Sequence, residues 1–277
     1  MPLHIRHETI YRYEEPVRQS VQTLKLTPRR EARQRTQQWS LLTPGRRNEQ
    51  VDAWGNVTHL LTIDEPHEEI RIVVSGVIDV DAEPLDRETG RLSPLVFRAA
   101  TPLTAADAAI QALAGSALRP GGGPQGGGLQ VGAIADADAL LALAAAICDG
   151  VRYRPGATTV ADTAITALGR GEGVCQDQAH VFLAACRTAG LAARYVSGYL
   201  HAGEQGEIAS HAWVDVWLEQ RGGWLGLDVT HQRMVDERYC RLAVGRDYLD
   251  AAPVRGVRRG GGGETLEVRV HVGDSAQ

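Results

Sequence analysis

One stretch decides the fold of this chain: residues 173–190, with the sequence GVCQDQAHVFLAACRTAG. Its apolar residues recur at helical spacing and predict one buried stripe, formed by Ala179, Phe182, Leu183, Cys186 and Ala189. Gly190 is the residue type that ends helices, and the glycines at 171 and 173 make the approach flexible. We therefore expect a helix that begins near Cys175 and ends before Gly190.

Cys175 lies in the first turn of this predicted helix. Unpaired backbone N–H groups and the positive end of the helix dipole favour a thiolate there over a thiol. The position therefore predicts an activated nucleophile. The alternative is a small buried apolar residue, the commonest fate of a free cysteine, which fits Cys186 in the middle of the stripe better. A catalytic Cys175 needs partners elsewhere in the sequence.

The composition is that of an ordinary globular protein. The chain has 277 residues, of which 43% are hydrophobic, enough for one large domain or two modest ones. Its net charge of -5 and its pI near 6.0 give no reason to expect nucleic acid or an anionic membrane as a partner. Nothing in the composition specifies an oligomeric state.

Neither the N-terminus nor the cysteines indicate secretion. Residues 1–7 lack the apolar core of a signal peptide, and the longest apolar run, 139–147, is too short to cross a bilayer. The four cysteines, at 148, 175, 186 and 240, include no C-x-x-C pair, so neither a disulfide framework nor a zinc ribbon is expected. We expect a cytoplasmic protein with reduced thiols, no metal and no cofactor.

The first 81 residues predict short alternating strands. These strands cover residues 4–13, 21–26, 37–42, 57–63 and 69–80, with a hairpin turn at 52–56. Five or more antiparallel strands predict a β-sandwich. No acid/base pair or metal cluster stands out in this part, which favours a scaffold or substrate-positioning module. Prolines and charges at 84–102 mark a crossing, so we expect a β-rich domain at 1–85 and a second domain at 100–277.

The second half of the chain is predicted to mix helices with strands. Two alanine-rich and leucine-rich helices end near residues 118 and 148, separated by a glycine run at 120–128 that we interpret as a surface loop. A strand at 192–200 follows the Cys175 helix, and residues 211–219 and 223–228 form a hairpin. Near the C-terminus we expect a solvated glycine-rich loop at 256–263 and a strand at 264–272 that closes the core sheet.

His211 and Asp228 lie on the two strands of the predicted hairpin. A nucleophilic cysteine needs a base within hydrogen-bond reach, and the base needs a third group to fix its tautomer. Cys175, His211 and Asp228 supply these three types. Direct opposition of His211 and Asp228 conflicts with a turn at glycines 222 and 223, so we expect a bulge or a wider loop. Considered alone, His211 also fits the pattern of a partly buried histidine in a strand, and Asp228 fits that of a residue that caps a turn.

Four segments resemble the bacterial transglutaminase-like family: residues 173–180, 193–199, 210–213 and 224–228, with the sequences GVCQDQAH, ARYVSGY, SHAW and WLGLD. The resemblance is strong over about 150–235, and the first 81 residues are similar to the β-rich domain that accompanies this core. It implies an α+β fold whose papain/transglutaminase-like core packs a catalytic helix on an antiparallel sheet. It also implies a catalytic triad of Cys175, His211 and Asp228. Gln178 departs from the family pattern, where an aromatic residue is common.

The resemblance implies acyl transfer at an amide, because family members are peptidases, amidases or acyl transferases. We expect Cys175 to attack the carbonyl of a peptide, protein or small amide substrate, with hydrolysis of the thioester favoured over transfer to an amine. The Cys175 N–H is expected to bind the oxyanion, with Tyr153, Gln176 or Trp213 as further candidates for a second donor or the pocket wall. The alternatives are a non-catalytic peptide-binding module and a zinc enzyme, the latter disfavoured because H-E-x-x-H is absent.

Overall fold

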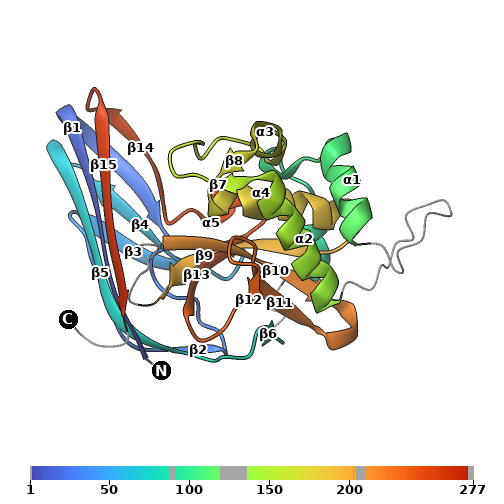
Figure 1. The fold of residues 1–277 in the computed structure, drawn as a ribbon. Helices are drawn as coiled ribbons and strands as arrows, with labels where there is room; N and C mark the ends of the chain where they lie inside the picture. The colour runs from blue at the N-terminus through green and yellow to red at the C-terminus, as the bar shows by residue number, and fades with distance from the viewer. Residues whose placement is uncertain (1, 88–91, 119–135, 202, 204–209, 274–277) are drawn as a thin grey trace.

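The strands of the first third of the chain and the last two strands form one antiparallel sheet in the computed structural model (Figure 1). The structure describes residues 2–87, 92–118, 136–201, 203 and 210–273, so the glycine run predicted at 120–128 lies outside the described residues. The strands of this N-terminal sheet are β1 (Pro2–Leu24), β2 (Gln34–Leu42), β3 (Arg46–Val51), β4 (Val57–Ile63), β5 (His67–Val80), β14 (Val254–Gly260) and β15 (Glu264–Gly273). The order is β2-β5-β1-β4-β3, and β14 and β15 also pair with β1.

Strand β1 is longer than the sequence pattern predicts. The expected strand at 4–13 and the first four residues of the one expected at 21–26 belong to one strand of 23 residues, which ends at Leu24. Pro16, which has no N–H to donate, lies between Tyr13, the last residue paired with β15, and Val17, the first paired with β14. Because the pairing is interrupted at the proline, no ladder hydrogen bond is lost and the strand continues across it.

The C-terminal strands belong to the N-terminal sheet, and two predictions are therefore wrong. Instead of a loop at 256–263 and a strand that closes the core sheet, β14 pairs with residues 17–24 of β1 and β15 pairs with residues 4–13 of the same strand. Alternation identifies a strand but not its partner, which tertiary packing selects. Gly256 permits the approach, since a Cβ there would lie 2.5 Å from the Val21 carbonyl oxygen. The domain boundaries 1–85 and 100–277 stay predictions.

A second antiparallel sheet, the core sheet, contains the predicted hairpin. Its strands are β6 (Leu85–Asp86), β9 (Ala193–Leu200), β10 (Ser210–Leu218), β11 (Gly223–Asp228), β12 (Arg233–Met234) and β13 (Tyr239–Gly245). The order is β12-β11-β10-β9-β13, and β6 pairs with β11. The strand predicted at 192–200 and the hairpin of β10 and β11 are confirmed. A short parallel ladder of β7 (Arg152–Tyr153) and β8 (Glu172–Gly173) comes shortly before Cys175.

Helix α4 is the central helix of the fold. The helices are α1 (Ala108–Ala117), α2 (Ala137–Gly150), α3 (Ala164–Arg170), α4 (Cys175–Thr188) and α5 (Tyr248–Ala251), with 3-10 turns at Pro94–Arg98, Pro102–Thr104 and Glu219–Arg221. As predicted, α4 begins at Cys175 and ends before Gly190, whose φ of 78° favours glycine. The helices α1, α2 and α3 pack around α4. Among the helices that the structure describes, none has the length and apolar character needed to cross a bilayer.

Burial of α4 extends around the whole helix rather than along one stripe. Residues 176–187 are all buried, because neighbouring helices cover the faces that a surface helix would expose to water. Polar side chains on α4 find partners inside the protein. Gln178 donates from Nε2 to the Val151 carbonyl oxygen at 2.8 Å, and Arg187 donates to three backbone carbonyl oxygens. The prediction of a single buried stripe is therefore too narrow.

The core sheet lies between the helices and the N-terminal sheet (Figure 1). One hydrophobic cluster joins helices α1 to α4 with strands β9, β10 and β11. A second cluster joins the N-terminal strands with Tyr199 of β9 and with Cys240 and Leu242 of β13. The layer that packs on the N-terminal strands is therefore the core sheet, and the predicted α+β class is confirmed.

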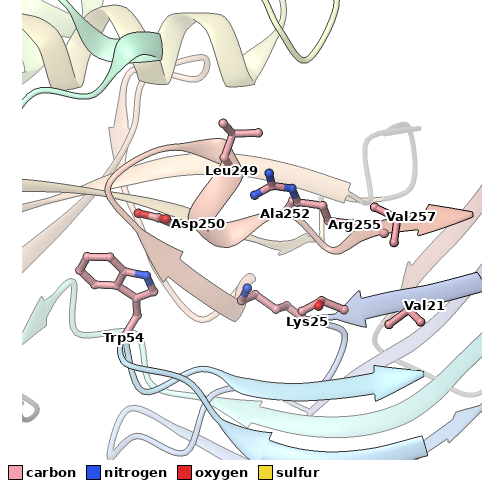
Figure 2. Close-up of a pocket in the computed structure, with 10 residues that line it drawn as sticks. Val21, Lys25, Trp54, Leu249, Asp250, Ala252, Arg255 and Val257 are labelled. Atoms are coloured by element: carbon pink, nitrogen blue, oxygen red, sulfur yellow. The ribbon is translucent and has the colours of Figure 1, made fainter. Parts of the chain in front are cut away.

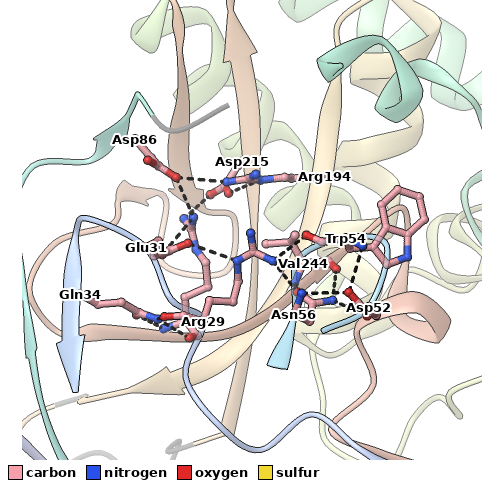
Figure 3. Close-up of polar contacts among 11 residues, drawn as sticks. Arg29, Glu31, Gln34, Asp52, Trp54, Asn56, Asp86, Arg194, Asp215 and Val244 are labelled. Atoms are coloured by element: carbon pink, nitrogen blue, oxygen red, sulfur yellow. Dashed lines mark hydrogen bonds and ion pairs between the residues drawn. The ribbon is translucent and has the colours of Figure 1, made fainter. Parts of the chain in front are cut away.

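A buried network of ion pairs also joins the N-terminal part of the chain to the core sheet (Figure 3). Asp215 of β10 accepts hydrogen bonds from Arg194 at 2.7 Å and from Arg241 at 2.9 Å. Arg241 lies 3.5 Å from Glu31, which in turn accepts from Arg29 at 3.2 Å. Buried charges are tolerated when they are paired in this way. The segment that precedes β2 is thereby held against the strands that carry His211 and Asp228.

Candidate active site

The first turn of α4 presents Cys175. This residue is the first of the helix and is half-buried. The Val174 N–H donates to Asp177 Oδ2 at 2.7 Å, so the helix start is capped by the side chain of its own third residue. As the first helical residue, Cys175 has no earlier turn whose carbonyl would accept its N–H. The predicted placement of a thiol at a helix N-terminus is confirmed.

His211 and Asp228 form a buried hydrogen bond across the hairpin. His211 Nε2 and Asp228 Oδ2 are 2.8 Å apart, and both side chains are fully buried. The strands pair in regular register, with Val214 opposite Leu227, so Asp228 meets His211 on the diagonal rather than directly. The expected wider loop is present, as a 3-10 turn at Glu219–Arg221, but direct opposition is not. A two-residue offset keeps both side chains on one face of the ladder.

Burial and hydrogen bonds shift the pKa values of His211 and Asp228 in opposite directions. Burial raises the pKa of Asp228, but hydrogen bonds from His211 and His231 outweigh it and hold that pKa well below the usual carboxyl range. Burial lowers the pKa of His211, but the hydrogen bond to Asp228 and the nearby Cys175 side chain outweigh burial and raise that pKa to about 10. At neutral pH the pair is therefore an imidazolium beside a carboxylate.

Nδ1 of His211 is the ring nitrogen left for Cys175. It makes no hydrogen bond within ordinary limits to any residue that the structure describes, and Cys175 is the neighbour whose thiol interacts with the ring. Catalytic hydrogen bonds are often long in unliganded enzymes and tighten when substrate binds. The structure thus brings together the three residues that the sequence predicts, Cys175, His211 and Asp228. Their catalytic role stays a prediction.

Asp228 has two further partners that the sequence analysis misses. His231 Nδ1 lies 2.7 Å from Asp228 Oδ2, and Tyr239 donates its hydroxyl to the same oxygen at 2.7 Å. The His231 backbone N–H donates to Asp228 Oδ1 at 3.1 Å. A histidine three residues after an aspartate in a turn is a local signal that could have found His231. Tyr239 comes from β13, and no local pattern links it to Asp228.

The other predicted pocket residues have different surroundings. Tyr153 is 39% exposed, and burial together with the nearby Cys175 raises its pKa. Trp213 is buried beside His211, with ring centroids 6.3 Å apart, and its Nε1 has no hydrogen-bond partner among the described residues. Gln176 is buried in the first turn of α4. Of the three, Tyr153 combines solvent exposure with proximity to the thiol.

The possible metal ligands of this site are already committed to hydrogen bonds. Within the described residues, His211, Asp228 and His231 are the group of three whose donor atoms all lie within 4.8 Å of one another. The Asp228 oxygen is bonded to each histidine at 2.7 to 2.8 Å. Ligands about 2.0 to 2.1 Å from one tetrahedral zinc ion would be roughly 3.3 Å apart. The arrangement is that of a hydrogen-bonded cluster rather than of a cation site.

A separate hollow lies between the N-terminal sheet and α5 (Figure 2). It has a volume of about 430 Å³ and is lined by Val21, Thr23, Lys25, Trp54, Leu249, Asp250, Ala252, Arg255, Gly256 and Val257. Lys25, a half-buried cation of this hollow, lies 3.6 Å from the carboxylate of Asp52. None of the three predicted catalytic residues lines it, so this hollow is not part of the candidate active site.

Comparisons with known proteins identify the family. Residues 3–79 match the bacterial transglutaminase-like N-terminal region, and residues 128–229 match the transglutaminase-like superfamily. An uncharacterized protein of Mycobacterium leprae is 31% identical to this chain, over 98% of each protein. The chain belongs to the transglutaminase-like superfamily.

A further relative of this transglutaminase-like protein agrees with it in length, and a solved structure agrees with it in fold. An uncharacterized protein of Mycobacterium tuberculosis is 34% identical over 91% of this chain and 86% of its own length. The structure of a candidate cysteine protease from Cytophaga hutchinsonii has a TM-score of 0.74 at 21% identity, covering 100% of this chain and 92% of that one. This likeness establishes the shared fold. The segment matched to the superfamily contains Cys175, His211 and Asp228 but ends before His231 and Tyr239.

Proposed function

We propose that this transglutaminase-like protein is a cysteine peptidase or amidase that hydrolyses a peptide or side-chain amide through a thioester. One observation carries the proposal: the buried hydrogen bond between His211 and Asp228 next to Cys175 at the start of α4. A nucleophile, a proton carrier and an orienting carboxylate are the parts that acyl transfer by cysteine requires.

In the first half of the reaction, the Cys175 thiolate attacks the amide carbonyl carbon and forms a C–S bond. His211, protonated at Nδ1, donates that proton to the leaving nitrogen as the C–N bond breaks. In the second half, His211 takes a proton from water while the water oxygen attacks the thioester carbon, which releases the carboxylic acid and the thiolate. Asp228 accepts from Nε2 throughout and keeps the ring oriented.

The backbone N–H of Cys175 is the proposed first donor to the oxyanion. Its position at the helix start leaves it without an intrahelical acceptor. Such a donor lowers the barrier by about 3 kcal/mol, because the full negative charge on the oxygen develops only in the transition state. Tyr153, exposed beside the thiol, is proposed as a wall of the substrate pocket.

The acceptor, the substrate and the compartment are parts of the same proposal. Water is the proposed acceptor, and an amine in its place would give transglutaminase-type transfer. The proposed substrate is a peptide, a protein or a small amide. We propose the cytoplasm because all four cysteines are free, which suits a reducing compartment. A non-catalytic peptide-binding module is the alternative, and the presence of Cys175, His211 and Asp228 argues against it.

Alkylation of each cysteine, read by mass spectrometry, tests the proposal without a known substrate. Iodoacetamide reacts with thiolates. Cys148 is the matched internal control, because it is half-buried like Cys175 and burial raises its pKa. We expect Cys175 to react below pH 7 and faster than Cys148, and the His211→Ala variant to lose that advantage. Equal rates at the two cysteines, with or without His211, contradict an activated nucleophile and favour the binding module.

Product analysis then separates hydrolysis from transfer. Peptides and glutamine amides are incubated with the wild type and with Cys175→Ala, in the presence and absence of a primary amine. Hydrolysis releases the acid whether or not the amine is present, whereas transfer gives the substituted amide. Turnover by Cys175→Ala at the wild-type rate contradicts a thioester mechanism.

A further inference from the structure

Asp228 accepts more hydrogen bonds than the orientation of His211 alone requires. Its Oδ2 is 2.8 Å from His211 Nε2, 2.7 Å from His231 Nδ1 and 2.7 Å from the Tyr239 hydroxyl. Its Oδ1 accepts the His231 backbone N–H at 3.1 Å. Since an ionised carboxylate only accepts, His231 Nδ1 is a donor here. Among the described residues, His231 is the one that bonds to both carboxylate oxygens.

The turn that carries His231 has an unusual backbone conformation. Gln232 has a φ of 53° and is the one described residue other than glycine with a positive φ. The chain reverses at residues 229–232, so that Arg233 of β12 pairs with Asp228 and His231 lies against the carboxylate. Such conformations are unfavourable for residues with a Cβ and persist where the surroundings enforce them, often at functional sites.

Two contacts fix this turn independently of the His231 ring. Thr230 donates its hydroxyl to Gln178 Oε1 at 2.7 Å, and Gln178 lies in α4, three residues after Cys175. The Cys148 thiol of α2 lies 3.1 Å from the Val229 carbonyl oxygen. The His231 side chain itself is 31% exposed. Its contribution is therefore expected at the carboxylate that it contacts rather than in the packing of the turn.

We infer that His231 is a positioning residue for the acyl transfer, which holds the Asp228 carboxylate so that Oδ2 stays on His211 Nε2. The terminal torsion of an aspartate is soft, and the hydrogen bonds from His211 and Tyr239 both reach Oδ2, so they leave Oδ1 free to swing about that oxygen. Two bonds from His231, one to each oxygen, remove that freedom. This inference rests on the proposed function, because it acts through His211 on Cys175.

Substitutions at His231 test the inference in the alkylation assay. His231→Ala removes the Nδ1 donor, whereas His231→Asn places an amide N–H close to where Nδ1 lies. We expect the alanine variant to slow Cys175 alkylation at pH 7 roughly tenfold, the usual effect of losing a hydrogen bond to a charged group. The asparagine variant should recover most of the rate. His67→Ala, a histidine of the N-terminal sheet, is the matched control and should leave the rate unchanged.

Cys148 shows whether the turn itself survives. Its thiol contacts the Val229 carbonyl, so a variant that unfolds the turn exposes Cys148 and accelerates its alkylation. The inference expects an unchanged Cys148 rate in His231→Ala. It is overturned if Cys175 keeps its wild-type rate in that variant, if asparagine fails to rescue, or if Cys148 accelerates as Cys175 slows. If wild-type Cys175 shows no His211-dependent reactivity, the proposed function itself fails, which is a distinguishable result.

Discussion

Replacing Asp215 with alanine tests how strongly the buried ion network of Figure 3 stabilises the protein. The Asp215 carboxylate is fully buried and accepts hydrogen bonds from Arg194 at 2.7 Å and Arg241 at 2.9 Å. Without it, the acidic groups that remain near these arginines are Asp86, 3.4 Å from each, and Glu31, 3.5 Å from Arg241. These contacts are longer and leave two buried cations with less compensation.

The expected loss is large because the two guanidinium groups cannot reach water. The side chains of Arg194 and Arg241 are only 6% and 2% exposed. Breaking a buried ion pair by removing one partner destabilises a protein by about 3 to 5 kcal/mol, since the remaining charge stays desolvated. At roughly 2 °C per kcal/mol for a chain of this size, the Tm of Asp215→Ala should fall by about 6 to 10 °C.

Thermal unfolding of the wild type, Asp215→Ala and Asp79→Ala measures the difference. Asp79, an aspartate of β5, is the matched control. It lies 3.2 Å from Arg35, and the Arg35 side chain is largely exposed to solvent. Surface pairs contribute little because water and salt screen them, so the Tm of Asp79→Ala should stay close to the wild type. Equal Tm values for the two variants would refute the argument, because they would mean that Arg194 and Arg241 find other compensation.

The charge on His211 predicts that the free energy of unfolding falls as pH rises from about 6.5 to about 10, because the folded state holds a proton that the unfolded state releases earlier. Between about pH 6.5 and 8, urea titrations should show a steeper fall in the wild type than in His211→Asn, and equal slopes contradict the charge pair. Above that range both proteins should lose stability, because burial raises the pKa of the Cys186 and Cys240 thiols. Gly198→Ala should lower soluble yield and Tm, since a Cβ would lie 2.1 Å from the Cys240 carbonyl oxygen, whereas Gly169→Ala, with no atom within 4 Å, should be tolerated. Arg187→Met should destabilise the protein by about 3 kcal/mol or more in denaturant titrations, because it leaves three backbone carbonyls without their donor. Arg35→Met, at an exposed position, is its control, and equal stability of the two variants contradicts the assigned role of Arg187.

Local signals predicted the parts of the site that lie within single elements. The start of α4 at Cys175 follows from helical spacing and from Gly190 at its end, both of which depend on neighbouring residues only. The hairpin of β10 and β11 follows from alternation, and the family motifs named His211 and Asp228 on it. The same reasoning predicted that only one face of α4 is buried. The other faces are covered by neighbouring helices, and the spacing of apolar residues within α4 does not indicate that contact.

The sequence by itself determined the helix that carries Cys175, most of the strands, the α+β class and the family, because spacing, end residues and short motifs are local properties. Only the tertiary structure decided which strands pair, so that β14 and β15 join β1, and only it brought His231 and Tyr239 onto Asp228. It also decided the ion network and contacts such as that of Gln34 with Arg241, 207 positions apart. Partner choice over such separations depends on packing and on the pairing of buried charges, which the pattern of a single segment does not specify.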